Sequence, residues 1–163
     1  MTVPELTTGL VSVEHAGELL TVRRAAFVTQ AQELNDPHLP VLTESLDEII
    51  ADLEAPHVVT VGAWLGHRLV GAVRIELAAE RATIDKFAVA PDLHGQGIGE
   101  QLLYGILPTL PEGIAEVWVA SGAGDEVHSL SEYTQGDGPA NTASELAVSY
   151  LQKILANSSV INE

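Results

Sequence analysis

A β-hairpin pattern at residues 57–77 limits the fold of this chain more than any other segment. Residues 57–65 read His-Val-Val-Thr-Val-Gly-Ala-Trp-Leu, which is rich in the β-branched and aromatic residues typical of strands. Gly-His at 66–67 supplies turn chemistry, and a second apolar run follows at residues 68–77. Two strands joined by so short a turn pair antiparallel, so we expect an antiparallel sheet at the centre of the fold.

One helix is expected ahead of the hairpin, from about Leu19 to Leu34. Apolar residues recur there at spacings of three and four. The sequence Asn-Asp-Pro at 35–37 ends the helix, because the residue before a proline avoids helical backbone angles. A weakly alternating segment before the helix, residues 9–14, is expected to be a short strand.

A second helix is expected to begin near Thr43 or Ser45, after a loop at residues 38–40. Ser45 and Glu48 have the spacing of a capping box, in which each side chain bonds a free backbone N–H at the helix start. Apolar residues then continue at helical spacing. This segment therefore predicts a short amphipathic helix between the first helix and the hairpin.

The chain after the hairpin alternates strand and helix. Strands are expected at residues 82–90 and 114–120, with a helix between them that starts at the glycine-rich segment 94–99 and ends at Pro108. The expected order is β-α-α-β-β-β-α-β. This predicts an α/β (α+β) fold whose central sheet is mixed, mostly antiparallel and flanked by helices.

The C-terminal part has a weaker pattern. We expect a single domain over residues 1–163, in which residues 121–163 form an irregular tail with one helical turn around residues 125–133. Residues 142–155 fit two interpretations. A capping box at Thr142 and apolar spacing favour a helix, whereas an alternating pattern also fits a final strand.

The composition limits the classes of partner that this chain is expected to bind. The chain has 7 Lys and Arg against 23 Asp and Glu, a formal net charge of −16. Such a chain repels nucleic-acid phosphates and anionic lipid surfaces and attracts cations such as amines, so we expect neither nucleic acid nor membrane as a partner. There is no cysteine, no membrane-length apolar run and no leader-like N-terminus. We therefore expect a cytoplasmic protein without a metal site.

One segment of the sequence predicts a binding site. It consists of a strand, Pro91, and the segment His-Gly-Gln-Gly-Ile-Gly at 94–99, which begins a helix. The first turn of a helix has unpaired N–H groups and a partial positive charge, and glycines allow a ligand to approach the backbone closely. Together they predict a cradle for a pyrophosphate. No Gly-Lys-Ser/Thr follows, so this is not a Walker loop. A purely structural turn remains the alternative.

Residues 89–103, Val-Ala-Pro-Asp-Leu-His-Gly-Gln-Gly-Ile-Gly-Glu-Gln-Leu-Leu, resemble the acetyl-coenzyme A motif of GNAT-type N-acetyltransferases. In that family a strand ends in valine and proline, and Arg or Gln, two residues, Gly, one residue, and Gly or Ala follow. The resemblance extends over about residues 11–120, where the order of helices and strands also matches. It implies a GNAT-like fold that uses acetyl-CoA as cosubstrate.

The resemblance also implies which residues bind that cosubstrate. At position 94 this chain has a histidine where the family usually has Arg or Gln, and a neutral histidine donates one hydrogen bond without a fixed charge. No Lys or Arg lies between Phe87 and Lys153, so no local cation is expected for the 3′-phosphate. The expected binding set is the backbone of Phe87, Ala88 and Val89 for the pantetheine arm, and His94 with the amides of Gly95, Gln96, Gly97, Ile98 and Gly99 for the pyrophosphate.

The reaction that the resemblance implies is direct attack of a small-molecule amine on the thioester, with an acid to protonate the thiolate and a base to deprotonate the amine. Tyr133 is the expected acid, with Tyr150 as its rival. Glu76 is the expected base, and Asp85 and His38 are alternatives.

Two other functions stay open: a non-catalytic acyl-CoA-binding or interaction module, and a nucleotide-binding domain. A homodimer is an open alternative as well, because many relatives dimerise through terminal strands.

Overall fold

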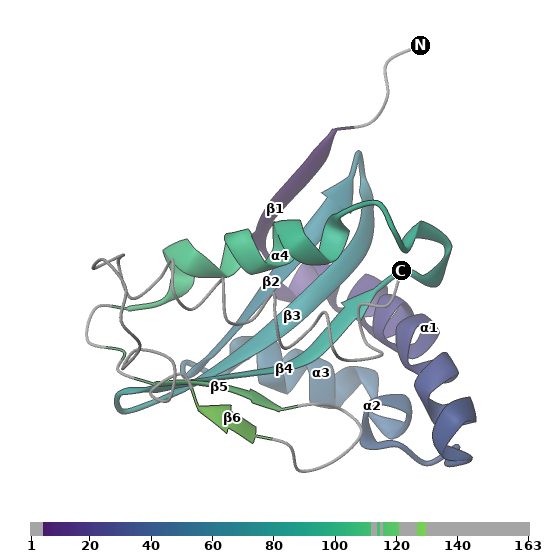
Figure 1. The fold of residues 1–163 in the computed structure, drawn as a ribbon, viewed down its shortest axis with the longest axis horizontal. Helices are drawn as coiled ribbons and strands as arrows, with labels where there is room; N and C mark the ends of the chain where they lie inside the picture. Colours follow the sequence, from purple (N-terminus) through teal and green to yellow (C-terminus); the bar gives the residue numbers. More distant parts are fainter. Residues whose placement is uncertain (1–4, 112–113, 115, 121–126, 130–163) are drawn as a thin grey trace, which may run out of the picture.

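The computed structural model describes residues 5–111, 114, 116–120 and 127–129. The strands among these residues form one sheet in the order β1-β2-β3-β4-β5-β6 (Figure 1). Neighbouring strands are antiparallel except for β4 and β5, which are parallel. The mixed, mostly antiparallel sheet expected from the sequence is confirmed. The strands are β1 (Leu6–Leu10), β2 (Val58–Leu65), β3 (Arg68–Ala78), β4 (Arg81–Val89), β5 (Glu116–Ala120) and β6 (Val127–Ser129).

Helices cover both faces of the sheet (Figure 1). Helix α4 packs on one face against β1, β2 and β3, while α1 packs on β3 and β4 from the other face and α3 on β2. No helix within the described ranges is long and apolar enough to cross a membrane. The helices are α1 (Ala16–Leu34), α2 (Pro40–Thr43), α3 (Leu46–Glu54) and α4 (Ile98–Ile106), with 3-10 turns η1 (Val13–His15), η2 (Pro91–Leu93) and η3 (Leu107–Thr109).

Several predicted elements are confirmed. The hairpin consists of β2 and β3, joined at residues 66–67. Helix α1 ends at Leu34, and Asn35 follows with a left-handed φ of 51°, a conformation that asparagine tolerates better than most residues. The predicted strand, helix and strand after the hairpin correspond to β4, α4 and β5.

Three local predictions are wrong. The first strand is Leu6–Leu10 rather than residues 9–14, because Val11 turns inward and its side chain packs beside Gly62. The expected loop at 38–40 gives way to α2 at Pro40, since proline at the first helical position has its φ already set. Residues 127–129 form β6 against β5 instead of a helical turn. Residues 142–155 lie outside the described residues.

Close packing fixes α4 on the sheet at Gly71 of β3. A Cβ atom added to Gly71 would lie 3.0 Å from Leu102 Cδ1 and 3.1 Å from both Ile98 Cγ2 and Ala88 O. The carbonyl is part of the backbone and cannot move aside as a side chain can. A side chain at position 71 would therefore push α4 away, and the glycine lets the N-terminus of α4 lie next to the end of β4.

An ion pair fixes α3 to the other face. The Asp52 carboxylate accepts hydrogen bonds from Arg74 Nε at 2.8 Å and Arg74 Nη2 at 2.9 Å. Burial alone would raise the pKa of Asp52, but the hydrogen bonds and charge of Arg74 outweigh it and lower the pKa. This contribution to stability is present above the ordinary carboxyl pKa and is lost as the pH falls through the lowered value.

The predicted capping box at the start of α3 is confirmed. Ser45 Oγ accepts from the Glu48 N–H, and Glu48 Oε2 accepts from the Ser45 N–H, both at 3.2 Å. We predict that Ser45→Ala lowers the free energy of unfolding by about 1 kcal/mol, because a backbone N–H loses its acceptor. Ser45→Asn keeps a side-chain acceptor, so its free energy of unfolding, measured by urea denaturation, should fall much less. Equal losses in the two variants would contradict the capping role.

A second prediction concerns Asp52. Asp52→Asn should lower the free energy of unfolding by about 2 kcal/mol at pH 7, because two hydrogen bonds to a charged group are weakened. The difference from the unsubstituted protein should shrink as the pH falls below about 4, where the carboxyl group becomes neutral. Glu54→Gln, at an exposed site on the same helix, is the matched control. A loss that is independent of pH would contradict the ion-pair explanation.

Candidate active site

The site begins with an irregularity in the pairing of β3 with β4. Ala72 lies opposite Ala88, whereas Arg74 lies opposite Asp85, so β4 has one more residue than β3 over this interval. The extra residue makes a β-bulge, and Lys86 within it has a φ of 48°, in the left-handed region that non-glycine residues rarely adopt. As a result, the consecutive side chains of Asp85 and Lys86 lie on the same face of the sheet. Asp85 bonds Arg74 of β3, whose guanidinium also bonds Asp52 on α3, and Lys86 bonds Glu44, just before α3.

The pairing of β4 with β5 ends just before this bulge. The parallel register runs from Arg81 opposite Glu116 to Ile84 opposite Val119 and goes no further among the described residues. Strand β4 itself continues to Val89. The last part of β4 therefore has a paired edge toward β3 and, within the described ranges, no strand paired on its other edge.

Backbone groups of β4 face this second edge. The Ala90 N–H donates to Val70 O at 2.8 Å, so residue 90 faces β3. Because N–H and C=O groups of an antiparallel strand alternate between its two sides, Ala88 also faces β3, while Phe87 and Val89 face away from it. Of the three residues expected to pair with pantetheine, this geometry directs the backbone groups of Phe87 and Val89 to the side on which no described strand pairs with this part of β4.

The loop after β4 has the backbone of an anion cradle. Gly95 and Gly97 have φ angles of 82° and 77°, and a Cβ atom on Gly97 would meet nothing within 4 Å. The Gln101 N–H donates to Gly97 O at 3.1 Å, so the four N–H groups of residues 97–100 have no acceptor within α4. None of the N–H groups of residues 95–99 bonds another described residue. These donors and the positive end of α4 suit a phosphate group.

His94 links this loop to the end of β4. Its Nε2 lies 3.3 Å from Val89 O, and because a carbonyl can only accept, Nε2 carries the proton. The residue is exposed. His94 therefore occupies one of the outward backbone acceptors of β4, while the Val89 N–H stays on the open edge.

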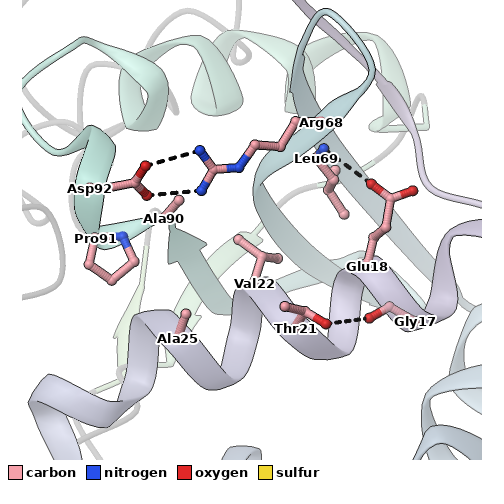
Figure 2. A pocket seen from close by; sticks show the side chains of 10 residues that line it. All are labelled: Gly17, Glu18, Thr21, Val22, Ala25, Arg68, Leu69, Ala90, Pro91 and Asp92. Atoms are coloured by element: carbon pink, nitrogen blue, oxygen red, sulfur yellow. Dashed lines mark hydrogen bonds and ion pairs between the residues drawn. The ribbon is translucent and has the colours of Figure 1, made fainter.

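An ion pair holds the loop from the other side. Arg68, at the start of β3, donates parallel hydrogen bonds of 3.0 and 2.9 Å to the two carboxylate oxygens of Asp92 (Figure 2). The hydrogen bonds from Arg68 lower the pKa of Asp92. A pocket of about 320 Å³ lies beside this pair, between α1 and the end of β4. Within it, the Glu18 carboxylate accepts from the Leu69 N–H at 3.3 Å.

The two candidate bases on the central strands share one arginine. Arg74 Nη1 donates to Glu76 Oε2 at 3.1 Å and to Asp85 Oδ2 at 3.0 Å. The Glu76 side chain is 43% exposed and that of Asp85 is 24% exposed. Burial raises the pKa of Asp85 and outweighs the attraction of Arg74. Asp85 therefore holds its proton at a higher pH than an ordinary aspartate does.

The other candidates lie apart from this cluster or outside the description. His38 is exposed in the turn before α2, where its backbone N–H donates to Asp36 Oδ1 at 2.9 Å. No contact among the described residues joins it to Glu76 or Asp85. Tyr133 and Tyr150 lie outside the described residues.

The bulge is the feature that sequence reasoning missed, although the sequence carries a signal for it. Ala82 and Ile84 are buried at a spacing of two, and so are Phe87 and Val89. Ile84 and Phe87, however, are three residues apart. A step of three in a two-residue repeat indicates one extra residue in the strand.

Comparisons with known proteins agree with this architecture. No curated protein matches the chain in sequence. A family model described as the acetyltransferase (GNAT) family matches residues 27–127. Among solved structures, PaiA N-acetyltransferase from Thermoplasma acidophilum in complex with coenzyme A has a TM-score of 0.64 at 16% identity, over 71% of this chain and 78% of that one.

Two further structures share the fold. The ribosomal-protein-S18-alanine N-acetyltransferase from Escherichia coli has a TM-score of 0.57 at 16% identity, over 71% of this chain and 66% of that one. The aminoglycoside acetyltransferase meta-AAC0020 from an uncultured soil metagenomic sample, in complex with sisomicin, has a TM-score of 0.56 at 14% identity, over 97% and 93%.

At these identities the structural likeness establishes the fold alone. The family model covers the chain from α1 to the start of β6, which includes the bulge, the open edge of β4 and the glycine-rich loop. The resemblance found in the sequence is thereby confirmed: this chain belongs to the GNAT family of acetyltransferases.

Proposed function

We propose that this protein transfers the acetyl group of acetyl-CoA to the amine of a small molecule. The observation that carries the proposal is that, among the described residues, β4 beyond Ile84 has no strand paired on its outer edge, and that this edge lies beside N-terminal N–H groups of α4 that bond no described residue. A strand edge can pair with an extended amide chain, and a helix N-terminus can bind a diphosphate. An acyl-CoA contains both of these parts in one molecule.

The residues present fit such a ligand. Phe87 and Val89 would pair with the pantetheine arm through their outward backbone groups. The amides of Gly95, Gln96, Gly97, Ile98 and Gly99 would hold the diphosphate, and His94 would fix the loop through Val89 O. When bound, acetyl-CoA supplies an activated thioester carbonyl.

We assign the base to Asp85 in preference to Glu76. A general base works best when its pKa is close to the working pH, and burial moves the pKa of Asp85 in that direction. Asp85 also lies next to the bulge, two residues before Phe87, whereas Glu76 lies on β3 and is more exposed. Tyr133, with Tyr150 as its rival, is the proposed acid that protonates the departing thiolate.

The negative charge of the chain supports a cationic small molecule as the acceptor. The chain carries a net charge of −16, and its field attracts amines. The aminoglycoside enzyme crystallised with sisomicin aligns with 97% of this chain, whereas the ribosomal-protein enzyme aligns with 71%. A thiol-release assay over small amines and alanine-terminated peptides tests the assignment. Turnover on peptides only would refute the small-molecule acceptor, and acetyl-CoA binding without turnover would indicate a non-catalytic module.

The cradle is tested at Gly97. Gly97→Trp should weaken acetyl-CoA binding at least about tenfold, since an indole would fill the open side of the loop. Gly97→Ala places a non-glycine residue at the same unfavourable φ but adds only a methyl group. It therefore separates the effect of backbone strain from that of a side chain that fills the binding site. Both variants should melt earlier, but only the tryptophan variant should lose most of its affinity in calorimetric titration. Unchanged affinity in Gly97→Trp would refute the cradle.

The base is tested by the pH profile. The acetylation rate should rise with pH through the raised pKa of Asp85, because only the carboxylate form accepts a proton. Asp85→Asn should lower kcat about 100-fold or more and remove the rise of the rate with pH. Glu76→Gln should lower kcat less than about tenfold, and the rate should still rise with pH as in the unsubstituted protein. The reverse pattern would assign the base to Glu76.

A further inference from the structure

We propose that Asp52 is a positioning residue for Asp85, the base of the proposed reaction. From α3 it occupies the two-pronged side of the Arg74 guanidinium, which leaves only Nη1 of that group for Asp85. The inference rests on the proposed function, because it takes Asp85 as the base. It assigns a part in the reaction to a residue of the helical layer, outside both the glycine-rich motif and the central strands.

The guanidinium of Arg74 connects α3 to the two central strands. Its Nε and Nη2 donate to the two oxygens of Asp52 at 2.8 and 2.9 Å, and this parallel pair fixes the plane of the group. The remaining nitrogen, Nη1, donates to Asp85 Oδ2 at 3.0 Å and to Glu76 Oε2 at 3.1 Å. Because a guanidinium is planar and rigid, the contact with Asp52 decides where Nη1 lies. The donor that faces Asp85 is therefore placed from α3.

The members of this network differ in their exposure to water. The Arg74 side chain is 11% exposed, and those of Asp52 and Asp85 are 20% and 24% exposed. Glu76 is 43% exposed, so water screens its attraction for Arg74 more strongly. If position 52 lost its charge, the strongest remaining anionic partner of Arg74 would be Asp85.

Two further cations act on Asp85, and both have a carboxylate partner of their own. Burial raises the pKa of Asp85, while Arg74 and then, more weakly, Lys86 and Arg23 lower it. Lys86 on β4 and Arg23 on α1 both bond the carboxylate of Glu44, just before α3. That carboxylate offsets their charges. Arg74 is therefore the cation whose counter-charge decides how Asp85 takes up a proton.

Loss of the Asp52 charge would bind Asp85 more tightly to Arg74. The freed guanidinium can present two N–H groups to Asp85 in place of one, and its full charge favours the carboxylate form. A carboxylate held in this way is a weaker base, because its pKa falls and its oxygens already accept hydrogen bonds. With Asp52 in place, burial raises the pKa of Asp85 in spite of the neighbouring arginine.

The experiment compares Asp52→Asn with Glu54→Gln. Each variant removes one negative charge from α3, but Glu54 is exposed, and no contact among the described residues joins it to Arg74. The carboxyl carbon of Asp85 is followed by NMR in isotope-labelled protein as the pH is changed. We expect the pKa of Asp85 to fall by about one pH unit in Asp52→Asn and by much less in Glu54→Gln. An unchanged or higher pKa in Asp52→Asn would overturn the proposal, and so would an equal fall in both variants.

The acetylation rate gives a second readout, which a merely structural role of Asp52 would not change. In Asp52→Asn the rise of the rate with pH should move down by about one pH unit, and the plateau of kcat should be about threefold lower, since a weaker base is less effective. Asp52→Glu restores the charge and should return the rise to its original pH. If the rise stays at its original pH in Asp52→Asn, Asp52 has no part in the reaction and the proposal is wrong.

Two precautions keep the result separate from stability and from the proposed function. All proteins are measured in sucrose, which favours the folded state, and well below each melting temperature. If the unsubstituted protein acetylates no amine, the proposed function fails, while the NMR titration still measures the effect of Asp52 on Asp85. An unchanged pKa of Asp85 in Asp52→Asn would then overturn this inference as well.

Discussion

The left-handed bulge at Lys86 is the constraint on which the rest of the site depends. One extra residue in β4, directly after the last described pair of β4 with β5, turns two consecutive side chains to the same face of the sheet. The position of the half-buried Asp85 and the ion pair of Lys86 therefore have a common cause.

Elements fixed by local chemistry could be predicted from the sequence. The hairpin at residues 66–67, the capping box at Ser45 and the glycine-rich loop each depend on residues close together in the chain. Elements fixed by distant contacts could not. The first strand shifts because Val11 packs beside Gly62, far along the chain, and Lys86 in the bulge bonds a carboxylate 42 residues away.

The same distinction applies to the candidate site. The motif identified the cradle, because helix N-termini and glycines act through the backbone whatever surrounds them. It did not reveal that Arg74 joins carboxylates 11 and 22 residues away, which lowers the pKa of Asp52 and opposes the raising effect of burial on the pKa of Asp85. Nor did it show that His94 bonds to Val89 O. Side-chain partners of this kind depend on the register of the sheet, which composition and spacing leave undetermined.

Under the proposed function, the acidic composition gives donor and acceptor different means of recognition. In the described part of the chain, Arg23, Arg68, Arg74 and Lys86 all pair with carboxylates, and the sequence has no Lys or Arg between Phe87 and Lys153. The cradle can bind an anionic donor through backbone N–H groups, which act over the first turn of a helix and need no side-chain charge. The field of the whole chain acts over a longer range, where it repels anions and attracts amines. Under the proposed function, donor recognition then depends on hydrogen-bond geometry at contact distance in the glycine-rich loop, while the attraction of a cationic acceptor depends on charge.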